Sequence, residues 1–115
     1  MITINRLKGK LIINPNQIPN NGIVYLYAEW SMKSVMNLSL LYRVIEKYEI
    51  NLYVYDIDEK YNEFAEKYSI KCHGIGETFW LHEGKIIHEI IGYENSEGEK
   101  RIRLFTENLI SYRKK

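Results

Sequence analysis

The segment VYLYAEWSMKSV, Val24 to Val35, contains the transition that decides the fold. It continues the apolar run GIVYLYAEW, residues 22–30, which is typical of a central strand buried on both faces. Ser31 then suits a helix N-cap, because its hydroxyl can accept a hydrogen bond from a first-turn amide. Apolar residues follow at three- and four-residue spacing and predict an amphipathic helix to about residue 48. They are Leu38, Leu41, Val44, Ile45 and Tyr48.

Two further helices and four further strands are predicted around this transition. Strands are expected at residues 11–13, at INLYVYDID (50–58), and at ETFWL (77–81) and KIIHEIIGY (85–93), with Gly84 in the turn of the last hairpin. Asp58 suits the cap of one helix, and Ser96 with Glu99 forms a capping box for the other. The apolar faces of these helices comprise Tyr61, Phe64, Ala65 and Tyr68, and then Ile102, Phe105, Leu109 and Tyr112.

Composition narrows the class of protein. The 115 residues suit a single domain, and 45% hydrophobic with 27% charged residues is typical of a globular chain. A formal net charge of +1 gives no reason to expect a nucleic-acid partner. No apolar run reaches 18 residues and no secretory signal is apparent, so no membrane contact is expected. Cys72 has no second cysteine with which to form a disulfide, which favours the cytoplasm.

Three segments of the sequence resemble segments that surround the active site in the thioredoxin family. AEWSMKS, residues 28–34, is similar to the family signature A-E-W-C-G-P-C without its cysteines, and the similarity continues ungapped to Tyr48. YSI at 68–70 and GIGETFWLHEGK at 74–85 resemble the segments that lead into and follow the family's second active-site loop. The resemblance covers roughly residues 22–112. It implies an α/β thioredoxin-like fold, whose central mixed sheet has parallel strands, a C-terminal antiparallel hairpin and helices on both faces.

The departures from the family pattern bear on function. Ser31 and Ser34 occupy the positions of the two cysteines, and a hydroxyl can neither attack nor resolve a disulfide. By the same resemblance Tyr25 replaces the buried aspartate, Val54 replaces its lysine partner, and Gly76 replaces the cis-proline. Dithiol–disulfide oxidoreductase activity is therefore not expected.

A noncovalent protein-binding role is the main functional hypothesis. The resemblance implies that the domain holds an extended partner segment in a shallow groove, as an adaptor, assembly chaperone or complex subunit. The same surface is expected to include Tyr27 and to leave Trp80 in the core. Ser31 is expected to cap its helix, with Ser34 exposed in the first turn. The binding residues predicted on this basis are Trp30, Ser31, Met32, Lys33, Ser34, Gly74, Ile75 and Gly76.

The alternative is a monothiol redox protein that uses Cys72 through mixed disulfides. Lys71 or an imidazolium at His73 would have to lower the pKa of the thiol for this chemistry. His73, His82 and His88 show no metal-ligand spacing, and no glycine-rich phosphate loop follows a strand, so neither a metal nor a cofactor is expected.

Overall fold

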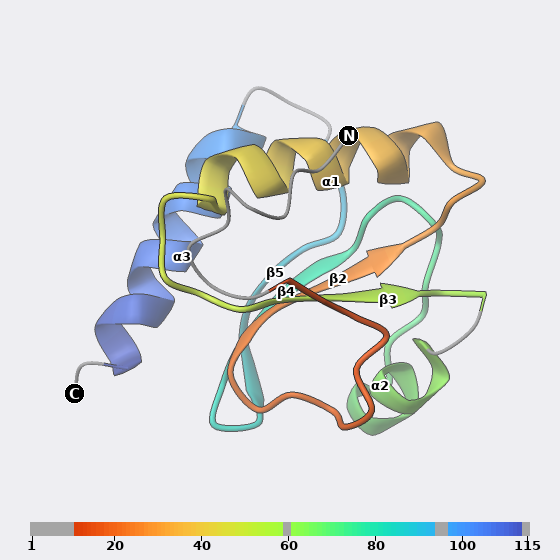
Figure 1. The fold of residues 1–115 in the computed structure, drawn as a ribbon, viewed down its shortest axis with the longest axis horizontal. Coiled ribbons are helices and arrows are strands. Elements are labelled where there is room, and N and C mark those ends of the chain that lie inside the picture. Colours follow the sequence, from red (N-terminus) through yellow and green to blue (C-terminus); the bar gives the residue numbers. More distant parts are fainter. Residues whose placement is uncertain (1–10, 59–60, 94–96, 114–115) are drawn as a thin grey trace.

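The computed structural model describes residues 11–58, 61–93 and 97–113, and these residues form five strands and three helices (Figure 1). Their order, β, β, α, β, α, β, β, α, is the order predicted from the sequence. The elements are β1 (Leu11–Ile13), β2 (Gly22–Tyr27), α1 (Met32–Ile45), β3 (Leu52–Asp56), α2 (Tyr61–Tyr68), β4 (Thr78–His82), β5 (Lys85–Ile90) and α3 (Gly98–Arg113).

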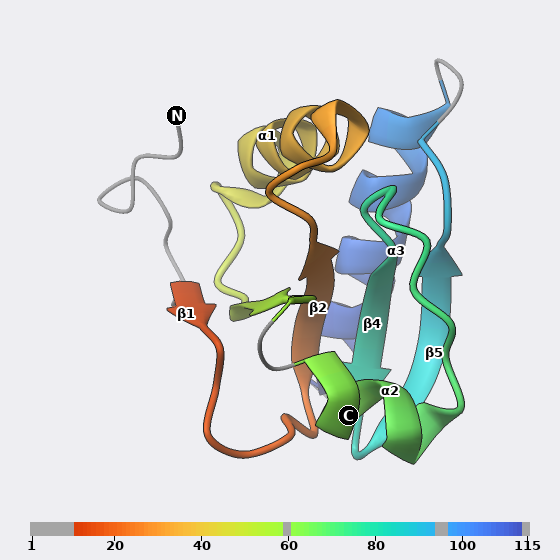
Figure 2. The same ribbon diagram turned by 90° about the vertical axis from the view of Figure 1, so that its right-hand side faces the viewer.

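The five strands form one mixed sheet in the order β1-β3-β2-β4-β5. β1, β3 and β2 run parallel, whereas β4 is antiparallel to β2 and pairs with β5 in the closing hairpin (Figure 2). The central strand β2 places Tyr25 between Val54 of β3 and Thr78 of β4. The predicted combination of parallel strands with a C-terminal antiparallel hairpin is confirmed.

Helices cover both faces of the sheet, as predicted. α1 and α3 lie on one face and α2 lies on the other (Figures 1 and 2). Alternate residues of β2 serve the two cores, because successive side chains of a strand point to opposite faces. Ile23 and Tyr25 pack in the cluster beneath α1 and α3, and Val24 and Leu26 pack with Phe64 of α2.

Four elements are shorter than the apolar pattern predicted. β3 spans Leu52–Asp56 and β5 spans Lys85–Ile90, whereas strands over residues 50–58 and 85–93 were predicted. β2 ends at Tyr27 and not at Trp30, because the chain turns there and the amide of Ser31 donates to the carbonyl of Ala28 at 3.1 Å. α1 ends at Ile45, whereas the pattern predicted a helix to residue 48. Tyr48 stays packed against the same core from the turn that follows, which explains why its spacing matched the helix.

The predicted hairpin turn at Gly84 and the predicted burial of Trp80 are confirmed. Glu83 and Gly84 both have positive φ angles, 49° and 78°, as a two-residue hairpin turn requires. Trp80 is fully buried in β4, as expected. Of the predicted caps, Ser96 lies outside the described residues, and so do residues 59–60, which follow Asp58. None of the helices within the described ranges is long and apolar enough to cross a bilayer.

Candidate functional site

The first turn of α1 begins at the predicted cap. Ser31 has an extended backbone, and its hydroxyl accepts a hydrogen bond from the amide of Ser34 at 3.3 Å. Met32 and Lys33 follow with exposed side chains. The N-cap prediction at Ser31 is confirmed.

Ser34 is not exposed, and the prediction that it lies at the surface was wrong. Its side chain is fully buried, and its Oγ accepts a hydrogen bond from the amide of Ala28 at 2.8 Å. Its carbonyl accepts a hydrogen bond from the hydroxyl of Tyr25. The chain turns back on itself between Ala28 and Ser31, which places the inner side of the first helical turn over β2. The Ser34 hydroxyl therefore stabilises the turn and does not face a ligand.

Tyr25 packs so closely against Gly76 that each residue type depends on the other. A Cβ atom at Gly76 would overlap the Tyr25 hydroxyl and would lie 2.9 Å from its Cζ, so no side chain fits there. Gly76 also has a φ angle of +90°, which L side chains rarely adopt. Burial raises the pKa of Tyr25 above its usual range, so the group is a neutral hydrogen-bond donor. By the resemblance, Tyr25 replaces an aspartate and Gly76 replaces a proline. The two replacements are coupled, because the Tyr25 side chain occupies the space that a side chain at position 76 would need.

The neighbouring loop holds the single cysteine next to a carboxylate. The thiol of Cys72 donates to Oε1 of Glu77 at 3.7 Å, and the backbone amide of His73 donates to Oε2 of the same buried side chain. Burial raises the pKa of Cys72 to about 11, and the negative charge of Glu77 acts in the same direction. This shift is opposite to the one that the monothiol hypothesis requires of Lys71 or His73.

Trp30 lies across Gly74, so two of the predicted binding residues are in contact. A Cβ atom at Gly74 would overlap the indole ring and would lie 3.0 Å from its Cζ2. The other edge of the indole faces solvent, since Trp30 remains 66% exposed. Only a glycine at this position lets the loop support the ring so closely.

Trp30 belongs to a group of exposed apolar side chains at the start of α1. Met32 is 73% exposed, Val35 38% and Met36 62%. Residues three and four positions apart share one side of a helix, so these three side chains are neighbours. We call Trp30, Met32, Val35 and Met36 the apolar cluster. The cluster lies where the resemblance puts the redox centre.

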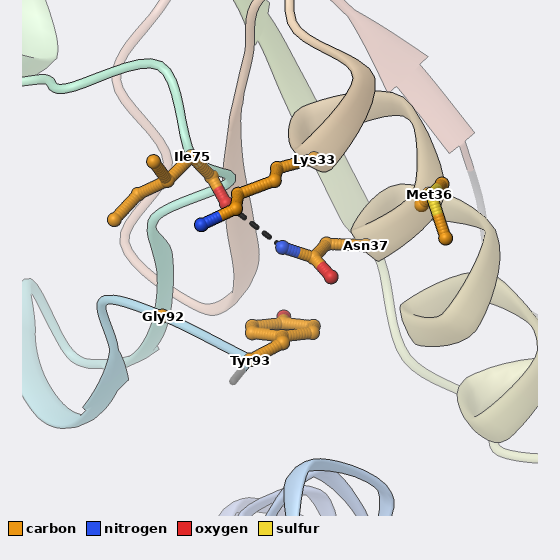
Figure 3. A pocket seen from close by; sticks show the side chains of 6 residues that line it. All are labelled: Lys33, Met36, Asn37, Ile75, Gly92 and Tyr93. Atoms are coloured by element: carbon orange, nitrogen blue, oxygen red, sulfur yellow. Dashed lines mark hydrogen bonds between the residues drawn. The ribbon is translucent and has the colours of Figure 1, made fainter. Parts of the chain in front are cut away.

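A pocket of about 470 Å³ adjoins the apolar cluster (Figure 3). Asn37 crosses it, and its Nδ2 donates to the carbonyl of Ile75 at 2.9 Å. The ring of Tyr93 lies on the opposite side of the Asn37 amide from Ile75 (Figure 3). The residues that line the pocket are Lys33, Met36, Asn37, Ile75, Gly92 and Tyr93.

The structure leaves five of the eight predicted residues accessible in this region and buries three. Trp30, Ser31, Met32, Lys33 and Ile75 are at least partly accessible. Ser34, Gly74 and Gly76 are buried, and Gly74 lies beneath the Trp30 ring. Tyr27 packs partly buried against the core.

Four residues of the pocket were missed from the sequence, namely Met36, Asn37, Gly92 and Tyr93. Asn37 follows Lys33 by one helical turn, which is the only local signal for it. Gly92 and Tyr93 follow β5 without a motif, and they reach the site only through the strand order. The hydroxyl of Tyr93 shares a hydrogen bond with Thr78 Oγ1, and burial raises the pKa of this tyrosine.

His82 and His88 do not lie together in a shared site. His82 stacks on Tyr112 with ring centroids 5.2 Å apart, and His88 stacks on Phe105 at 4.2 Å. In the hairpin, His88 pairs with Trp80 and not with His82. Within the described ranges, no three His, Cys, Asp or Glu side chains gather in a way that suits a metal ion.

The chain is similar to known proteins in its structure and not detectably in its sequence. No protein-family model and no curated protein sequence matches it. Among solved structures, a point mutant of thioredoxin from Halobacterium salinarum superposes with a TM-score of 0.66 at 17% identity, covering 89% of this chain and 91% of that one. Thioredoxin from Schistosoma mansoni gives a TM-score of 0.62 at 23% identity, covering 86% and 98%. Mitochondrial thioredoxin 3 from Saccharomyces cerevisiae gives 0.61 at 19%, covering 78% and 79%.

At these identities the likeness establishes the architecture. The neighbours are thioredoxins, and the strand order, the closing hairpin and the helices on both faces agree with the resemblance seen in the sequence. The 115 residues contain one cysteine, so the chain cannot form a disulfide within itself. The chain therefore has the thioredoxin fold, with serines at both positions where the resemblance puts the cysteines.

Proposed function

We propose that this domain binds another protein noncovalently through the apolar cluster and the adjoining pocket, and that it carries out no dithiol–disulfide exchange. The observation that supports this best is the exposure of Met32 and Met36 beside a pocket, at the helix start where the resemblance puts the redox centre. Leaving such side chains in water costs free energy that a partner recovers when it covers them.

The chemistry of the surrounding groups supports binding over catalysis. The hydroxyl of Ser31 caps the helix, and that of Ser34 is buried and bonded to a backbone amide. Cys72 is a neutral thiol at physiological pH, because its pKa is raised to about 11. A reactive thiolate, on which mixed-disulfide chemistry depends, is scarce under these conditions.

An extended partner segment would meet the chain at Ile75. The Ile75 carbonyl already accepts a hydrogen bond from Asn37, but a carbonyl oxygen has two lone pairs and can accept a second bond. Backbone pairing at this loop would give affinity, and side chains placed over the apolar cluster would give selectivity.

Affinity capture from a lysate of the source organism, with and without reductant, tests the proposal. The tagged protein, Met36→Ser and Leu104→Ser would be compared, because Met36 and Leu104 are equally exposed, at 62% and 61%, and Leu104 lies on α3. We expect one captured protein to be weakened roughly tenfold by Met36→Ser and unaffected by Leu104→Ser or reductant. Equal capture by both variants would contradict the proposal. Release by reductant together with loss in Cys72→Ser would establish the monothiol alternative instead.

A further inference from the structure

Glu77 is a buried carboxylate that the proposed function does not use. None of its surface is exposed, and it stands directly before β4. One carboxylate oxygen accepts a hydrogen bond from the backbone amide of His73, and the other accepts one from the thiol of Cys72 at 3.7 Å. Among the described residues, no Lys, Arg or His side chain forms an ion pair with it. A buried charge is usually paired with a cation, so the two hydrogen bonds are what holds the charge of Glu77.

The Glu77 side chain fixes the loop of residues 71–76 to the sheet. Glu77 itself is held by β2, because its backbone carbonyl accepts a hydrogen bond from the amide of Leu26 at 2.9 Å. Both partners of its carboxylate belong to the loop. Gly74 and Gly76 have φ angles of +73° and +90°, and glycine can leave such a conformation for others without a steric penalty. The hydrogen bonds to Glu77 therefore restrain a segment whose glycines would allow it to move.

The indole ring of Trp30 rests on the same loop. A Cβ atom at Gly74 would overlap this ring, so the ring and the loop backbone are in direct contact. Gly74 follows His73, whose amide the Glu77 carboxylate holds. Loss of that hydrogen bond would free the backbone that supports the indole, so Trp30 reports on the state of Glu77.

We propose that Glu77 makes the loop acid-sensitive: protonation of its carboxylate releases residues 71–76 and the Trp30 ring, while the rest of the fold stays intact. Proton binding removes the charge that strengthens the hydrogen bond from the His73 amide. It also adds an O–H donor beside an N–H and an S–H that are themselves donors. The inference concerns this loop alone and does not depend on the proposed binding role.

The other titratable groups around Glu77 come from the loop, from β2 and from the end of β3. Burial raises the pKa of Cys72 to about 11, and it raises the pKa of Tyr25 above its usual range, so both stay neutral between pH 8 and pH 4. Asp58, which follows β3, acts on Cys72 through its charge, and the side chain of His73 is exposed. Asp58 and His73 are therefore the two groups that need control variants.

A pH titration by NMR, on the full chain labelled with carbon-13, nitrogen-15 and 5-fluorotryptophan, tests the inference. As the pH falls from 8 to 4, three signals are expected to shift together: the side-chain carboxyl carbon of Glu77, the amide of His73 and the fluorine of Trp30. The His73 amide proton should move upfield, because its hydrogen bond weakens. The fluorine of Trp80, which is buried in β4, should not shift in this step, and Trp30→Phe assigns the two fluorine signals.

Three variants assign the proton. Glu77→Gln has no titratable carboxyl at this position and is expected to lose the shared step, whereas Asp58→Asn and His73→Gln keep Glu77 and the backbone amide and are expected to retain it. A step that persists in Glu77→Gln, or disappears in either control, would overturn the inference.

The native chain decides the question even if Glu77→Gln does not fold. No shift at the His73 amide, or a shift there without one at Trp30, would show that the loop is not released. A step at Trp30 that follows a carboxyl other than that of Glu77 would overturn the assignment. A simultaneous change at Trp80 would mean that acid unfolds the whole domain, and it would overturn the inference as well.

Discussion

Substituting Gly76 by alanine tests whether the close contact between Tyr25 and Gly76 stabilises the fold. An alanine there has two costs: a backbone at φ +90°, and a Cβ that overlaps the Tyr25 hydroxyl. The left-handed backbone costs about 1–2 kcal/mol for an L residue, and forcing an atom into a packed interior costs about 1–3 kcal/mol more. We therefore expect Gly76→Ala to lower the free energy of unfolding by about 2–5 kcal/mol.

Gly84 provides a matched control for the strain alone. Its φ angle is +78°, but a Cβ added there would lie 3.4 Å from its nearest neighbour, the Oδ1 atom of Asn20. Gly84→Ala is expected to cost only the backbone term, about 1–2 kcal/mol. The lost flexibility of the unfolded chain is the same in both variants and cancels in the difference.

Urea unfolding followed by tryptophan fluorescence gives both values, because Trp80 is fully buried in the folded state. In a Tyr25→Phe background the clash with the hydroxyl is gone, so the excess cost of Gly76→Ala should shrink by about 1 kcal/mol. Equal losses for Gly76→Ala and Gly84→Ala would refute the reasoning. They would mean that the Tyr25 ring moves aside freely and does not fix the loop.

Three further predictions concern single groups. The pKa of Cys72 is about 11, against an ordinary 9.0. Cys72 should therefore react with iodoacetamide at pH 8 about 100-fold more slowly than a free cysteine, and the rate should increase as the pH rises. A rate near that of free cysteine would contradict the raised pKa. Ser34→Ala removes the acceptor of the Ala28 amide and should lower the unfolding free energy by about 1–3 kcal/mol, measured in urea, whereas no loss would show that the amide finds another partner. Thr106→Val leaves the indole N–H of Trp80 unpaired in the core and should cost a similar amount, with an unchanged urea midpoint as the result that argues against it.

The sequence by itself determined the elements and their order. Strict apolar spacing, the Ser31 cap and the hairpin turn at Gly84 are local properties, so they could be predicted without knowing what packs where. Helix length was overestimated at Tyr48, because a residue beyond the helix can pack against the same core and continue its spacing. The parallel direction of β2 and β3 could also be inferred, because a helical crossover joins them, whereas the order of the strands in the sheet was not predicted.

Only the tertiary structure decided which groups at the site are available. Ser34 is buried because the turn before it brings its hydroxyl to the Ala28 amide, and Gly76 is needed because Tyr25 extends beneath it from a neighbouring strand. The pKa of Cys72 rises through burial and through Glu77, which no spacing in the sequence places against the thiol. Tyr93 likewise reaches the pocket through the strand order, although it follows Asn37 by 56 residues in the chain. Burial and charge act through space, and distances between residues far apart in the chain are set only when the sheet assembles.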